Sequence, residues 1–482
     1  MQPGDFRKAG YALVDQIARF LETLASRPVT PAETPKALQR LLDQPAPERG
    51  ADVPTLLANA AELLFNHSLF NGHPRFWGYI TSSAAPIGAL GELLAAAVNP
   101  NVGAFALSPI ATEIERQTIR WIAEWIGYPT GCGGIFVSGG NMANFAGFLT
   151  ARKNKVTWNV GKVGLSNHPA LTVYCAEGTH TWIQKAADLF GSGTDSIRWI
   201  GTNRKQQINP DVLRARIEAD LAEGHFPFLV VGNGGSVGTG AVDPLSELAA
   251  ICDDYNLWFH IDGAYGVPAT MLREHHDLFR GLERADSVAL DPHKWFYSPL
   301  EAGSILVRDS NALHQAFSFH PEYYKFEGSG DDPVVNFHEY GLQNSRGFRA
   351  LKVWLGMQQA GKNGIAEMIR DDISLAKTMY ERVSENESLE AISTNLSITV
   401  FRYVPPDLKE HAGSNLDYLN RLNEELLDRL QRGGEIFLSN AVVNSKYCLR
   451  ACIVNFRTTL RDIEALPEIV IRTGSETDAA LR

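Results

Sequence analysis

Cysteine, positive charge and long apolar runs are all scarce in this sequence of 482 residues. Its five cysteines, a small and odd number, argue against a disulfide framework and predict buried thiols in a reducing compartment. Cys448 and Cys452 lack a second Cys or His pair, so their spacing does not favour a zinc site, and we expect no metal. The formal net charge of −11 argues against a nucleic-acid binder, because neutralising phosphates needs clustered Lys and Arg.

The apolar runs are also too short to predict a membrane span. The most apolar stretch, residues 87–98, is shorter than the roughly 20 residues that a helix needs to cross a bilayer, and it contains Glu92. No signal peptide opens the chain. We therefore expect a cytoplasmic protein whose partner is a small molecule, with no nucleic acid and no membrane involved.

Length and patterning predict three parts. A chain this long exceeds one small core. Apolar residues recur at helical spacing from Phe6 to Leu24 and are followed by prolines between residues 28 and 47. We therefore expect an N-terminal helical arm or dimerisation segment over residues 1–85. A large domain over residues 86–370 and a smaller α+β domain over residues 371–482 would follow.

Strand-like and helical segments alternate through the large domain. This alternation predicts an α/β fold with a mostly parallel sheet covered by helices. Ligands of such sheets bind beyond the carboxyl ends of the strands. The expected strands cover residues 134–137, 171–176, 226–231, 257–262, 287–290 and 303–307, with helices over residues 142–152 and 245–255. The smaller domain has expected strands over residues 396–401 and 447–455 and a helix over residues 415–431.

The run Asp291-Pro292-His293-Lys294-Trp295 directly follows an expected strand. A lysine in this place can form a Schiff base with pyridoxal 5′-phosphate (PLP). That chemistry also needs a carboxylate for the pyridine nitrogen and an anion site for the phosphate. Taken alone, Lys294 could equally be an exposed lysine after a strand.

Asp262 supplies a carboxylate at the end of another expected strand. A negative charge beside the pyridine N1 keeps that nitrogen protonated, which makes the ring an electron sink. Ala264 is small enough to lie under such a ring. The alternative is that Asp262 is a turn residue before Gly263.

Gly139, Gly140 and Asn141 join a strand to a helix and could bind the phosphate through free N–H groups at the helix N-terminus. Glycine-rich turns of this kind are also common without a ligand. His180 follows the strand of residues 171–176 and could stack on the pyridine face or be a structural histidine. Residues 232–240 end another strand and could border the cofactor or simply turn the chain.

Together these motifs resemble the group II PLP-dependent decarboxylases, most closely the aromatic-L-amino-acid decarboxylase type. The most specific part pairs residues 260–265 with residues 291–295. The resemblance implies fold type I of PLP enzymes and an obligate homodimer with active sites at the interface. It makes Lys294 the Schiff-base lysine, Asp262 the partner of N1 and His180 the stacking residue. Tyr323, on a loop over residues 319–339, aligns with the lid tyrosine that protonates the product carbon.

The resemblance implies further contacts. Val237 stands where relatives have a threonine near the ring hydroxyl, so Ser236 is expected to take over. Ser345 stands where the residue varies with the substrate ring and weakly disfavours indole substrates. Cofactor contacts are expected from Gly139, Gly140, Asn141, Ser236, Ala264, Asp291 and His293. Substrate contacts are expected from Phe76, Trp77, Tyr79, Ile80 and Thr81, and from Phe105 and Leu107 across the subunit boundary.

We therefore expect a PLP-dependent carboxy-lyase that removes the α-carboxylate of an aromatic L-amino acid and releases an amine and CO₂. Two alternatives within PLP chemistry are an aromatic aldehyde synthase, against which Tyr323 and His180 argue, and an aminotransferase. Arg450 could be mistaken for the carboxylate clamp of an aminotransferase, but decarboxylating relatives carry an arginine there too. A further alternative is a ligand-binding relative without catalysis. The sequence does not identify the amino acid.

Overall fold

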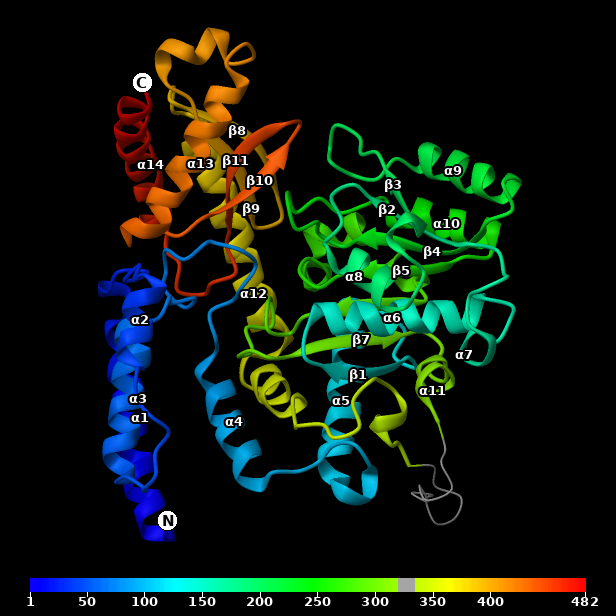
Figure 1. Cartoon of the computed structure of the whole chain (residues 1–482), viewed down its shortest axis with the longest axis horizontal. Helices are drawn as coiled ribbons and strands as arrows, with labels where there is room; N and C mark the ends of the chain where they lie inside the picture. The colour runs from blue at the N-terminus through cyan, green and yellow to red at the C-terminus, as the bar shows by residue number, and fades with distance from the viewer. Residues whose placement is uncertain (320–333) are drawn as a thin grey trace. The chain divides into compact units, whose positions relative to one another are not determined.

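The computed structural model describes residues 1–319 and 334–482 (Figure 1). These residues divide into two units. The first comprises Met1–Tyr79, Leu375–Ser393 and Thr399–Arg482, and the second comprises Ile80–Ser374 and Thr394–Ile398. Residues 1–79 of the expected arm thus share a unit with most of the expected small domain, because their backbone and side chains bond to residues near the C-terminus.

A seven-stranded sheet forms the centre of the second unit, in the order β1-β7-β6-β5-β4-β2-β3. Neighbouring strands are parallel except where β7 pairs antiparallel with β1 and β6. The predicted mostly parallel α/β fold is therefore confirmed. The strands are β1 (Gly133–Val137), β2 (Leu171–Ala176), β3 (Ile197–Ile200), β4 (Phe226–Asn233), β5 (Trp258–Asp262), β6 (Ser287–Leu290) and β7 (Gly303–Val307).

Helices cover both faces of this sheet. On one face, a Cβ added to Gly147 of α6 would lie 2.7 Å from the His260 ring of β5. On the other face, a Cβ added to Gly232 of β4 would touch both Phe259 of β5 and Leu248 of α10. Because Phe259 and His260 are consecutive in a strand, their side chains point to opposite faces. The helices of this unit include α4 (Pro86–Val98), α5 (Pro109–Ile126), α6 (Gly140–Lys155), α8 (Trp182–Leu189), α9 (Pro210–Ala222), α10 (Leu245–Tyr255) and α11 (Ala312–Phe317).

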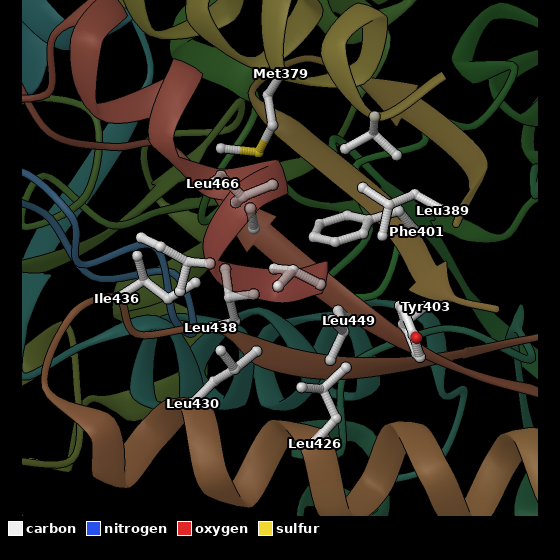
Figure 2. Close-up of a cluster of buried hydrophobic side chains, with 14 of the residues drawn as sticks. Met379, Leu389, Phe401, Tyr403, Leu426, Leu430, Ile436, Leu438, Leu449 and Leu466 are labelled. Atoms are coloured by element: carbon white, nitrogen blue, oxygen red, sulfur yellow. The ribbon is translucent and has the colours of Figure 1, made fainter. Parts of the chain in front are cut away.

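The first unit builds its own core on a four-stranded sheet of order β10-β11-β9-β8. The long helix α12 (Ala350–Ser384), which is kinked at Gly361, contributes Met379 to this core, and α13 contributes Leu426 and Leu430 (Figure 2). None of the described helices is long and apolar enough to cross a membrane. The remaining elements are α1 (Pro3–Thr23), α2 (Pro35–Leu41), α3 (Val53–His67), β8 (Leu389–Asn395), β9 (Ile398–Tyr403), α13 (Leu416–Gly433), β10 (Ser439–Val443), β11 (Lys446–Cys452) and α14 (Leu460–Leu481).

Trp77 shows why the N-terminal segment belongs to this unit. Its side chain is 0% exposed, and its indole N–H donates to Thr458 Oγ1 over 3.2 Å. Its backbone N–H donates to the carbonyl of Phe437, and its own carbonyl accepts from Cys452. Residues far apart in the chain therefore satisfy each other's polar groups.

Candidate active site

The carboxyl ends of β1, β2, β4, β5 and β6 lead into the residues around one cavity of about 410 Å³ in the second unit. Such an edge is where parallel sheets bind ligands. The cavity brings together ten of the residues predicted from the sequence: Ile80, Gly139, Gly140, Asn141, His180, Asp262, Ala264, Asp291, His293 and Lys294. Ser138, Met142, Asn144, Asn233, Gly235, Val237, Tyr265 and Leu300 complete its lining.

Lys294 lies one turn after β6, where its Nζ is 3.0 Å from Asp291 Oδ2. The turn is closed by the Lys294 N–H, which donates to the Asp291 carbonyl over 2.8 Å. Asp291 is only 3% exposed, and its Oδ1 has no partner in the described part of the chain. Lys294 therefore lines the cavity beside a buried carboxylate whose Oδ1 can still accept a hydrogen bond.

Asp262 closes β5 and is in register with Asn233 at the end of β4. Its two oxygens accept different hydrogen bonds. Oδ2 accepts the indole N–H of Trp182 over 2.8 Å, and Oδ1 accepts the backbone N–H of Ala264 over 3.3 Å. These two hydrogen bonds thus fix the orientation of the Asp262 carboxylate, which borders the cavity.

Two imidazoles border the same cavity, and burial lowers the pKa of both His180 and His293. In each case Nδ1 accepts a backbone N–H, that of Trp182 for His180 over 3.3 Å and that of Ala302 for His293 over 3.1 Å. The neutral rings therefore carry their proton on Nε2. His293 Nε2 is 3.6 Å from Asp291 Oδ2, so it points toward the carboxylate that pairs with the lysine.

The turn between β1 and α6 has the features of an anion site. Gly139 is the N-cap of α6 and supplies no side-chain cap, so N–H groups of the first turn stay available for an anion. A Cβ added to Gly140 would lie 2.8 Å from Asp291 Oδ2 and 3.4 Å from Ala264 Cβ, so glycine keeps this cradle open. An uncapped helix N-terminus, a lysine and a strand-end carboxylate around one cavity fit PLP.

Several predicted residues lie elsewhere. Ser236 does not line the cavity, and its hydroxyl hydrogen-bonds Thr239 Oγ1 over 3.0 Å; Val237 and Gly235 line the cavity instead. Phe76 and Trp77 are buried in the first unit, to which Tyr79 also belongs. Tyr323 lies outside the described residues. The structure does not bring Thr81, Phe105, Leu107 or Ser345 to the cavity lining.

The sequence reasoning missed Asn233, Asn144 and Trp182. Asn233 is buried and donates through Nδ2 to Asp243 Oδ2 over 2.9 Å and to Thr179 Oγ1 over 3.2 Å. The expected strand stopped at residue 231, two residues before it. Extending that strand to the sheet edge would have placed Asn233 beside Asp262. No sequence signal indicates the contact of Trp182 with Asp262.

The fold and this cavity define the class as PLP-dependent enzymes of fold type I. The chain belongs to the pyridoxal-dependent decarboxylase family, because the family model described as "Pyridoxal-dependent decarboxylase conserved domain" matches residues 35–404. The predicted cofactor, PLP, and the predicted enzyme class, a PLP-dependent amino-acid decarboxylase, are thereby confirmed.

Individual relatives cover nearly the whole chain. An aromatic-L-amino-acid decarboxylase of Bacillus atrophaeus is 32% identical over 460 residues, which cover 95% of this chain and 93% of the relative. A phenylacetaldehyde synthase of Arabidopsis thaliana is 30% identical over 94% of this chain and 92% of the relative. The crystal structure of Oryza sativa TDC with PLP and tryptamine superposes with a TM-score of 0.92 at 26% identity, covering 99% of each chain.

Proposed function

We propose that this enzyme removes the α-carboxylate of an aromatic L-amino acid and releases the corresponding amine and CO₂. The observation that carries the proposal is the meeting of Lys294, Asp262 and the uncapped start of α6 around one cavity. Relatives named as aromatic-L-amino-acid decarboxylase and tyrosine decarboxylase support the aromatic class.

PLP, when bound, supplies a protonated pyridine ring that accepts the electrons of the breaking bond between Cα and the carboxylate. Gly139, Gly140 and Asn141 would hold its phosphate at the N-terminus of α6. Asp262 would hold the proton on its ring nitrogen, because a nearby negative charge favours the cationic form. Ala264 and His180, which both line the cavity, would contact the ring.

Lys294 would be the residue that holds the cofactor covalently. Its amine must lose a proton before it can act as a nucleophile. Asp291 Oδ2 lies 3.0 Å from this amine, and the neutral His293 ring lies 3.6 Å from the same carboxylate. His180 stays neutral at pH 7 because burial lowers its pKa, so it adds no positive charge beside the ring.

For the substrate, Ile80 and Leu300 offer apolar surface in the cavity lining. Seven further residues remain proposed contacts for the substrate: Phe76, Trp77, Tyr79, Thr81, Phe105, Leu107 and Ser345. Tyr323 remains the residue proposed to protonate the product carbon. Ser236 remains a proposal for the ring hydroxyl, although the cavity borders Val237 instead.

A panel of amino acids tests the proposed reaction. Purified protein loaded with PLP would be given Phe, Tyr, DOPA, Trp, 5-hydroxy-Trp, His and Glu, with CO₂ and product measured together. We expect CO₂ and an equal amount of amine from at least one aromatic substrate. The aldehyde synthase among the relatives makes oxidative chemistry the second candidate. Aldehyde with peroxide in place of amine would favour that candidate, and turnover of Glu alone would contradict the aromatic class.

A homodimer with active sites at its interface completes the proposal. Four apolar side chains of α4 are each more than half exposed in the single chain: Leu90, Leu93, Leu94 and Val98. Leu107 and Ile110, the second residue of α5, are exposed to a similar extent. Exposed apolar side chains gathered on one helix are typical of an interaction surface. We expect light scattering of the PLP-loaded protein to give twice the chain mass of 53.0 kDa. A mass of one chain across the working concentration range would contradict it.

The cytoplasm is the proposed location. No disulfide joins any of the five cysteines, all of which lie in the described residues, and four of them are buried. Cysteines of this kind suit a reducing compartment.

A further inference from the structure

Trp182 connects two of the residues proposed to hold the cofactor ring. It is the first residue of α8, two positions after His180, and its side chain is 0% exposed. Its indole N–H donates to Asp262 Oδ2 over 2.8 Å, and its backbone N–H donates to His180 Nδ1 over 3.3 Å. The stacking imidazole and the acid for N1 are therefore both held by one residue that does not itself line the cavity.

The indole is the strongest hold on the Asp262 side chain. Among the described residues, Asp262 accepts one hydrogen bond from another side chain, that of Trp182, and one longer bond of 3.3 Å from the Ala264 backbone. Hydrogen bonds to charged acceptors are stronger than neutral ones and fix orientation. Without the indole N–H, the carboxylate would keep only the longer bond and could turn about its side-chain torsions.

The indole in turn packs against the neutral imidazole ring of His260. His260 meets it edge to face, with ring centroids 5.8 Å apart and an interplanar angle of 82°. Asn144 Oδ1 can only accept, so His260 Nε2 donates to it, and the Nδ1 of the neutral ring accepts from Ser287 Oγ, which itself accepts the indole N–H of Trp258. Both ring nitrogens are thus satisfied in the neutral form, and burial lowers the pKa of His260 to about 4.

We propose that Trp182 is a positioning residue of this site, whose indole N–H fixes the orientation of the Asp262 carboxylate toward the cofactor ring. Because His260 stays neutral, it does not offer the Asp262 carboxylate a positively charged partner in competition with the indole N–H. The proposal rests on the proposed function, since it assumes that Asp262 meets the ring nitrogen.

The main test compares Trp182→Phe with a matched control, Trp354→Phe. Phenylalanine keeps an aromatic ring against His260 and removes only the N–H and part of the ring. Trp354 also donates its indole N–H over 2.8 Å, to Gln117 Oε1, but lies outside the cavity. Apo-protein titrated with PLP, followed by visible absorbance, should give a dissociation constant about ten- to a hundred-fold higher for W182F, the range for one hydrogen bond to a charged acceptor. W354F should match the unaltered protein.

Two further measurements separate positioning from packing. We expect W182F to lower kcat while KM stays close to that of the unaltered enzyme, and to change the visible spectrum of the loaded protein. In an Asp262→Ala background the same change at Trp182 should have no further effect on PLP affinity, because its acceptor is gone. Equal losses in both backgrounds would show that Trp182 only fills space.

A shape-preserving replacement covers the case in which W182F does not fold. Incorporating β-(benzothiophen-3-yl)alanine at position 182 replaces the indole N–H by sulfur and keeps both fused rings. The same weakening of PLP binding should appear. If this variant and W182F both bind PLP like the unaltered protein, the proposal for Trp182 is overturned. If the unaltered protein itself binds no PLP, it is the proposed function that fails.

Discussion

Replacing Lys294 with alanine should abolish the visible absorbance of the Schiff base between protein and PLP and lower kcat by at least about 10³-fold. The reason is that its amine is the one lysine nitrogen lining the cavity in the described part of the chain. Alanine removes that nucleophile and leaves the buried Asp291 without its 3.0 Å partner. We therefore also expect some loss of thermal stability in the variant, because an uncompensated buried charge is costly.

The covalent link can be located independently of turnover. After borohydride reduction of the loaded protein, peptide mass spectrometry should find the pyridoxyl group on Lys294. Lys153→Ala is a matched control, since it removes an exposed lysine near the end of α6. It should keep the absorbance, the adduct and the turnover. An adduct on a different lysine, or unchanged absorbance in Lys294→Ala, would refute the assignment.

Replacing Asp262 with asparagine should lower kcat by about 10²–10³-fold, the scale of removing one preorganised electrostatic group from a site. Asparagine keeps the shape and still offers an oxygen to the Trp182 indole, so the variant removes the charge and, of the two hydrogen bonds, only the longer one from the Ala264 N–H. The pyridine nitrogen would then lose the negative neighbour that favours its protonated form. The loaded variant should still show a cofactor bound to Lys294, but with an altered visible spectrum.

The measurement is CO₂ release at saturating substrate and PLP, alongside the spectrum. Asp254→Asn serves as the control, because Asp254 lies on α10 and forms an exposed ion pair with Arg214. That variant should behave as the unaltered enzyme. If D262N retained full kcat, the carboxylate could not be the group that keeps the ring protonated.

Local patterns predicted the part of the fold that carries the site. The strands that end at Asp262 and Leu290 are short, apolar runs followed by polar residues, and such runs stand out in a sequence. β3 was missed because its sequence, IRWI, contains a charged residue and a tryptophan, Trp199, that is 39% exposed, so it lacks the continuous apolar run of a buried strand. β8 was missed because its sequence, LEAISTN, is largely polar and only its first residue is fully buried.

Within the site, the contacts that the sequence can predict directly are those inside one motif. Lys294 and Asp291 are three positions apart, so a single run of sequence places them together. The bond between Trp182 and Asp262 spans 80 positions and depends on how α8 packs against β5, which no local pattern encodes. The choice between Ser236 and Val237 depends on a turn in which Ser236 bonds Thr239. A shift of one residue there decides which side chain faces the cavity.

Trp77 has a consequence for how the polypeptide is made. Its hydrogen-bond acceptor, Thr458, lies 381 positions later, so the tryptophan leaves the ribosome long before that threonine has been synthesised. Until synthesis is nearly finished, the indole and the backbone carbonyl of Trp77 lack their native partners, and transiently exposed apolar surface of this kind is prone to aggregation. A chain truncated before β11 would therefore leave Trp77, near its beginning, without the partners at Cys452 and Thr458.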